Sequence, residues 1–188
     1  MDTSFGPSAL ATPANAVTFA RLLCAPALWL LILAAAPSYA VLAIWIVLAA
    51  TDGVDGYLAR RHGTTRSGAF LDPLADKALV LGAMWALVAA DTFWWLPVAL
   101  ITARELGISV FRSYWGRRGL AVPASRLAKV KTVVQAVAVG LALLPPVAEN
   151  QAWLASSALW LAVALTLVTG GQYLVEGSRA TRSGGVRT

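Results

Sequence analysis

Six mainly apolar stretches, each of about twenty residues, account for most of this sequence. A helix needs about 20 apolar residues to cross the hydrocarbon core of a membrane, where an exposed backbone finds no hydrogen-bond partner in the lipid. Charged residues make up only 13% of the chain, whereas soluble domains carry about 25%. The sequence therefore predicts an all-α integral membrane protein, a bundle of six transmembrane helices at residues 17–36, 39–60, 71–90, 93–115, 127–147 and 152–175.

Basic residues gather at one end of the predicted helices. The connections near residues 37–38, 91–92 and 146–151 contain no Lys or Arg. Lys and Arg instead flank the connections near residues 61–67 and 116–126, and both terminal regions. By the positive-inside rule, both termini and the two basic connections are expected on the cytoplasmic side. Because the net charge of +6 follows helix ends, it indicates topology and attraction to anionic lipid, and it does not indicate a nucleic-acid partner.

The chain divides into three segments on this interpretation. Residues 15–177 are expected to form the six-helix transmembrane domain. Residues 1–14 are mildly apolar and contain two prolines, so we expect a segment that is either interfacial or disordered. Residues 178–188 are rich in Gly, Ser and Arg, which is typical of a disordered basic tail.

A cluster of acids interrupts the apolar pattern where the second predicted helix ends and the third begins. Asp52 and Asp55 are three residues apart, and Asp72 and Asp76 are four apart, so each pair lies on one face of its helix. Ionised side chains are costly at membrane depth, and a cluster of them is a candidate functional site. Carboxylates this close need counter-charge, and hard divalent cations such as Mg²⁺ or Mn²⁺ prefer oxygen ligands. Four acids suit a site for two ions; an ion-pair network with nearby arginines is the alternative.

The spacing of these acids resembles the signature of the CDP-alcohol phosphatidyltransferases. The matching positions on the second and third predicted helices are Asp52, Asp55, Gly56, Ala59, Arg60, Gly68, Asp72 and Asp76. The connection between the two halves of the signature is one residue shorter than in the usual form. Connections between helices tolerate changes in length, so this difference does not weaken the resemblance.

The resemblance implies an enzyme that moves a phosphatidyl group from CDP-diacylglycerol to an alcohol and releases CMP. It implies that Asp52, Asp55 and Asp72 bind the metal ions, and that Asp76 both binds metal and takes the proton from the acceptor hydroxyl. Contacts with the CDP part of the donor would come from Gly56, Ala59, Arg60 and Gly68. For Gly56 and Ala59, close packing of small residues between helices is the alternative. A homodimer in a bacterial cell membrane is also expected from the family.

A second set of residues, outside the signature, bears on the acceptor. The stretches around Arg104 and Arg112, and around Lys129 and Lys131, resemble those of bacterial family members that use sn-glycerol 3-phosphate. Arg104 and Arg112 are eight apart, close to two helical turns, and the two lysines begin the fifth predicted helix. We therefore expect a basic pocket that binds the phosphate of the acceptor. Anchoring at the membrane surface is the alternative for Lys129, and an ion pair with Glu105 is the alternative for Arg104.

Other functions remain open at this stage. An inositol phosphate would also need a basic pocket, and phosphatidylglycerol, the acceptor in cardiolipin synthesis, would need a second lipid groove. A divalent-cation transporter could use the acids as an ion path. However, the ionisable groups gather at one end of the predicted helices, which favours an enzyme over a route across the membrane.

Overall fold

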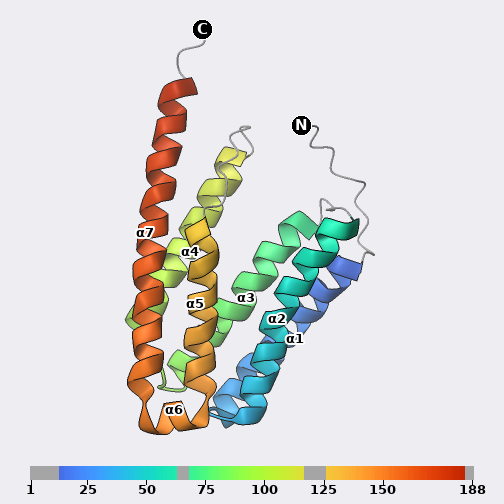
Figure 1. Cartoon of the computed structure of the whole chain (residues 1–188), viewed down its shortest axis with the longest axis vertical. Coiled ribbons are helices and arrows are strands. Elements are labelled where there is room, and N and C mark those ends of the chain that lie inside the picture. Colours follow the sequence, from blue (N-terminus) through green and yellow to red (C-terminus); the bar gives the residue numbers. More distant parts are fainter. Residues whose placement is uncertain (1–12, 63–67, 117–125, 185–188) are drawn as a thin grey trace.

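The described part of the chain is entirely helical. The computed structural model describes residues 13–62, 68–116 and 126–184, with side chains for residues 16–51, 74–110, 127 and 129–172. Within those ranges the elements are α1 (Pro13–Ala35), α2 (Tyr39–His62), α3 (Gly68–Ala89), α4 (Trp95–Gly116), α5 (Arg126–Leu143), α6 (Pro145–Asn150) and α7 (Ala152–Gly184). Figure 1 shows the long helices running roughly along one another, with the short α6 at one end of the bundle.

The long helices correspond to the six predicted segments, which confirms the all-α prediction for the described residues. Two of them contain stretches long and apolar enough to cross a membrane, Ala16–Ala35 in α1 and Ala152–Gln172 in α7. A shorter apolar stretch, Tyr39–Thr51, lies in α2.

The largest differences between the structure and the sequence prediction are at three helix boundaries. The fifth predicted segment was expected to continue to residue 147, but α5 ends at Leu143 and a separate helix begins at Pro145. Proline has no backbone N–H to continue the hydrogen-bond ladder of α5, and it is well accommodated in the first turn of a new helix. At the other two boundaries, α1 begins at Pro13, and the backbone of α7 is helical through Gly184, beyond the predicted domain boundary at residue 177.

One hydrophobic core holds the helices together. The most extensive contacts join α1 to α3 and α5 to α7, while α1 also packs on α2, and α4 on α7. Gly82 of α3 lets the Trp29 indole of α1 lie directly on the α3 backbone, because a Cβ at Gly82 would overlap the ring. Trp45 of α2 is 2% exposed, and its Nε1 donates to the backbone oxygen of Ala136 in α5 at 3.3 Å. These contacts fix α2 and α3 relative to the rest of the bundle.

The two ends of the bundle carry different features. At one end, the α1–α2 turn contacts the end of α5 through a hydrogen bond from Ser38 N to Leu143 O at 3.2 Å. The helix ends that carry the predicted site lie toward the other end, where α2 finishes and α3 and α5 begin (Figure 1). The fold therefore gathers the predicted acidic and basic residues toward one end of the molecule.

Candidate active site

The acidic signature lies on the last turns of α2 and the first turns of α3. Asp52 and Asp55 belong to α2, and Asp72 and Asp76 belong to α3, so both spacings do occur on helical backbone. Asp76 is half-buried. The structure describes only the backbone at the other three aspartates. The same holds for the predicted CDP contacts Gly56, Ala59, Arg60 and Gly68.

The donor chemistry of the signature fits a hard divalent cation. Three-residue and four-residue spacings on α2 and α3 place the four aspartates, two and two, on one face of each helical backbone. Carboxylate oxygens are the ligands that Mg²⁺ and Mn²⁺ prefer. Among the side chains that the structure describes, which include only Asp76 of the signature, no group of three His, Cys, Asp or Glu comes together.

A buried arginine borders the acidic end of α2. Arg21 of α1 is only 1% exposed, and its Nε donates to Thr51 Oγ1 at 3.2 Å. The Thr51 hydroxyl in turn donates to Leu48 O at 2.6 Å. Because Thr51 immediately precedes Asp52, this contact ties α1 to the turn of α2 where the acids begin. A buried guanidinium at this point also supplies positive charge beside the acidic signature.

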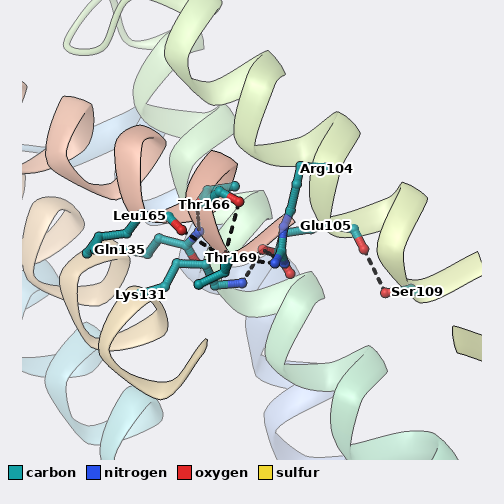
Figure 2. A network of polar contacts seen from close by, with 8 residues as sticks. All are labelled: Arg104, Glu105, Ser109, Lys131, Gln135, Leu165, Thr166 and Thr169. Carbon is teal, nitrogen blue, oxygen red and sulfur yellow. Dashed lines mark hydrogen bonds and ion pairs between the residues drawn. The ribbon is translucent and has the colours of Figure 1, made fainter. Parts of the chain in front are cut away.

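A cationic cluster, comprising Arg104, Glu105, Lys131 and Thr169, lies between three helices (Figure 2). The Glu105 Oε1 atom accepts hydrogen bonds from Arg104 Nη1, at 3.1 Å, and from Lys131 Nζ. Arg104 Nη2 donates to Thr169 Oγ1 at 2.8 Å. The side chains of Arg104, Lys131 and Glu105 are 10%, 6% and 11% exposed, respectively. Among the described side chains, these two cations share one carboxylate in a largely buried environment, a combination that suits binding of an anion.

The cationic cluster lies close to the acidic half of the site. Lys77, the residue after Asp76 on α3, is near enough to Lys131 for the two positive charges to repel each other. Asp76 and Lys131 therefore belong to neighbouring regions at the same end of the bundle.

The structure brings together two of the four basic residues predicted to bind the acceptor. Arg104 and Lys131 share Glu105, whereas Lys129 is exposed on α5. A separation of two residues rotates a side chain by about 200° around a helix, which explains the different environments of the two lysines. Arg112 belongs to α4, but its side chain lies outside the described residues. The ion pair between Arg104 and Glu105, kept open as an alternative, is present.

Several polar residues of this region were missed by the sequence interpretation. Thr169 contacts Arg104 directly, and Gln135 of α5 donates to Thr166 Oγ1 of α7 at 3.3 Å. Both threonines are 0% exposed, and Gln135 is 3% exposed. The available signal was their spacing: Lys131 and Gln135 are four apart, and the threonines are three apart, so each pair marks a polar face on an apolar helix.

An apolar groove runs between α2 and α5 and has a volume of about 440 Å³. One end of the groove is lined by Ala49 and Val133, each two residues from Thr51 of α2 and Lys131 of α5, respectively. The groove therefore approaches both the acidic signature and the cationic cluster. Trp45 lies in the groove and bridges the two helices through its bond to Ala136. The lining residues are Leu42, Trp45, Ile46, Ala49, Val133, Ala136, Val137, Gly140, Leu141 and Leu144.

The fold and the site together indicate a membrane-associated enzyme that handles charged and apolar groups at the same place. A family model described as CDP-alcohol phosphatidyltransferase matches residues 11–168. The chain belongs to the CDP-alcohol phosphatidyltransferase family, and it is therefore a transferase.

Individual relatives support this assignment. Over 190 aligned residues the chain is 38% identical to a probable phosphatidylglycerophosphate synthase of Mycobacterium tuberculosis (strain ATCC 25618 / H37Rv), covering 97% of this chain and 88% of that protein. It is 40% identical over 144 residues to the CDP-diacylglycerol–glycerol-3-phosphate 3-phosphatidyltransferase of Escherichia coli (strain K12), covering 72% and 77% of the two chains. The Bacillus subtilis (strain 168) protein of the same name is 38% identical over 143 residues, with 74% of each chain covered.

Proposed function

We propose that this protein transfers the phosphatidyl group of CDP-diacylglycerol to sn-glycerol 3-phosphate, forming phosphatidylglycerophosphate and CMP. The observation that carries the choice of acceptor is the cationic cluster, where Arg104 and Lys131 lie buried around a single carboxylate. A phosphorylated alcohol supplies the anion that such a cluster favours, and a guanidinium binds phosphate oxygens with directed hydrogen bonds. The names of the relatives describe the same donor and acceptor.

The reaction is a displacement at phosphorus. A hydroxyl oxygen of sn-glycerol 3-phosphate bonds to the phosphorus that carries diacylglycerol, and the bond from that phosphorus to the bridging oxygen breaks. CMP leaves with the bridging oxygen, and Asp76 takes the hydroxyl proton. Arg104 and Lys131 hold the acceptor by its existing phosphate, so that the reacting hydroxyl is delivered as a positioned group.

Asp52, Asp55, Asp72 and Asp76 would hold two Mg²⁺ or Mn²⁺ ions, and the chemistry supplied by bound ions is polarisation of the diphosphate and neutralisation of the CMP leaving group. The backbone of α2 and α3 would contact the CDP part at Gly56 and Gly68, where the absence of a side chain permits close approach. Ala59 and Arg60 complete the proposed donor contacts.

The apolar groove between α2 and α5 would hold an acyl chain of the donor. The groove offers an almost entirely apolar lining, which suits hydrocarbon. Its stretch on α5, from Val133 to Leu141, rises about 12 Å along the helix, a length suited to part of a fatty acyl chain. A lipid in this groove would place its headgroup toward Thr51 and the acidic signature.

This function requires a particular placement in the cell membrane of a bacterium. We propose that the six long helices all cross the membrane and that both termini and the candidate site face the cytoplasm, where CDP-linked and phosphorylated substrates are present. The concentration of basic residues beside the helix ends at the site supports this orientation. A homodimer is proposed on the basis of the family.

An acceptor panel tests the proposal. The purified protein would be reconstituted with CDP-diacylglycerol and Mg²⁺ and offered sn-glycerol 3-phosphate, an inositol phosphate or phosphatidylglycerol, with CMP release and lipid product measured for each. We expect CMP release with sn-glycerol 3-phosphate. Turnover with either of the other acceptors alone would overturn the choice of acceptor, and metal flux into liposomes without turnover would overturn the enzymatic function.

A further inference from the structure

The Arg104 side chain is held against α7 by two consecutive residues. Thr169 accepts a hydrogen bond from Arg104 Nη2 at 2.8 Å. Beside it, Gly170 leaves room for the stem of the same side chain: a Cβ at Gly170 would lie 3.2 Å from Arg104 Nε and 3.4 Å from Cγ. Figure 2 shows Arg104 reaching from α4 toward Thr169, with the Glu105 side chain beside its guanidinium. The position of the guanidinium therefore depends on α7 as well as on its own helix.

The Thr169 hydroxyl has a direction that suits this role. Its Oγ1 lies 2.7 Å from Leu165 O and 3.1 Å from Thr166 O, so its single proton is donated to its own helix. The oxygen lone pairs then point away from the α7 backbone, and arginine can only donate to them. Thr169 thus acts as a fixed acceptor for one edge of the guanidinium, while the Glu105 carboxylate fixes another nitrogen.

Gly170 adds a steric requirement. A Cβ contact of 3.2 Å is tighter than nearly all such contacts in proteins, so a methyl group here would displace Arg104 by a few tenths of an ångström. The next residue, Gly171, has nothing within 4 Å of the same hypothetical atom. The two adjacent glycines therefore differ in one respect relevant to the site, which is contact with Arg104.

We infer that Thr169 and Gly170 are positioning residues that set the orientation in which Arg104 meets the phosphate of the acceptor. This inference rests on the proposed function, because it concerns the same acceptor site. The family match ends at residue 168, immediately before these two residues. Displacement of a guanidinium by a fraction of an ångström weakens a directed contact with phosphate, but it leaves the donor site on α2 and α3 untouched.

Two pairs of variants test the inference. Thr169→Val removes the hydroxyl that accepts from Arg104 and keeps the shape of the side chain. Thr166→Val is its control, because the Thr166 hydroxyl accepts its hydrogen bond from Gln135 of α5. Gly170→Ala moves Arg104, and Gly171→Ala is its control. For Thr169→Val and Gly170→Ala we expect the KM for sn-glycerol 3-phosphate to rise about 10-fold or more, as for loss of one hydrogen bond to a charged group.

The KM for CDP-diacylglycerol should stay within about twofold of the wild-type value in all four variants. Thr169→Ser keeps the hydroxyl, so its KM for the acceptor should stay close to the wild-type value. Two results would show that Thr169 and Gly170 serve helix packing alone, and either would overturn the inference. One is a rise of both KM values together; the other is a lower melting temperature without any change in the KM for the acceptor. If Thr169→Val fails to fold, the comparison of Gly170→Ala with Gly171→Ala decides the question alone. A wild-type protein that uses a different phosphorylated acceptor overturns the proposed function, and this inference is then measured with that acceptor.

Discussion

Replacing Glu105 by Gln tests the electrostatic account of the cationic cluster most directly. The substitution keeps the size of the side chain and removes the charge that Arg104 and Lys131 contact through one oxygen atom. Removal of one partner from a buried ion pair costs about 3–5 kcal/mol, because the remaining charge stays buried without compensation. Glutamine still offers one carbonyl oxygen to a donor, and the Glu105 side chain is 11% exposed, so we expect about 3 kcal/mol, at the lower end of this range.

The assay is thermal unfolding of the purified protein, followed by tryptophan fluorescence. For a chain of this size a change of 1 kcal/mol shifts Tm by about 2–4 °C, so Glu105→Gln should lower Tm by about 6–12 °C. Glu149→Gln is the matched control, since Glu149 is exposed on α6, and its Tm should stay at the wild-type value. A Tm of Glu105→Gln within about 2 °C of wild type would refute the assigned role of the carboxylate.

The same variant also makes a prediction about anions. Without Glu105 the cluster carries two positive charges close together, so an added phosphate dianion regains part of the lost electrostatic energy. sn-Glycerol 3-phosphate should therefore raise the Tm of Glu105→Gln more than that of the wild-type protein, whereas glycerol should change neither. Equal shifts in the two proteins would show that the acceptor phosphate binds elsewhere.

Three further substitutions test other parts of the structure. Gly82→Ala places a methyl group inside the Trp29 indole, and we expect a loss of about 1–3 kcal/mol, measured as a lower Tm. Gly140→Leu fills the apolar groove and should raise the KM for CDP-diacylglycerol about tenfold, equivalent to two methylene groups left unburied, whereas Gly107→Leu, facing open space, should leave it unchanged. Asp76→Asn should lower kcat by at least about 10²-fold in a protein that still folds; retention of most of the activity would exclude Asp76 as the base.

Most of the fold could be predicted because long apolar stretches separated by turn-forming residues impose one simple helical pattern. Each long helix corresponds to an apolar stretch, and turn-forming or charged residues separate it from the next one. The main exception is α6, where Pro145 both ends one helix and starts another. A proline pair predicts an interruption, but whether the residues after it form a turn or a short helix depends on burial, and here Val147 is buried against the bundle.

The two halves of the candidate site differ in how far the sequence could predict them. The acidic half lies within one connected stretch of α2 and α3, so its spacing on helices could be recognised directly. The role of Arg21 was harder to recognise, since its contact with Thr51 spans 30 residues and depends on the packing of α1 against α2. A single arginine within an apolar helix signals that some partner is present, because a buried guanidinium without one is unstable.

The same argument explains why Glu105 could be anticipated as a partner of Arg104 and Thr169 could not. Glu105 is the adjacent residue, whereas Thr169 lies 65 residues away and is brought to Arg104 by the packing of α4 on α7. A threonine in an apolar helix can satisfy its hydroxyl with its own backbone, as Thr169 does with Leu165 O, so the sequence contains no unmet requirement at that position. The buried charge predicts that a partner exists, while the rotation of the neighbouring helix determines which side chain it is. A residue such as Thr169, whose hydroxyl already has a hydrogen-bond partner in its own helix and which helix packing brings to Arg104, can be assigned to the site only from the structure.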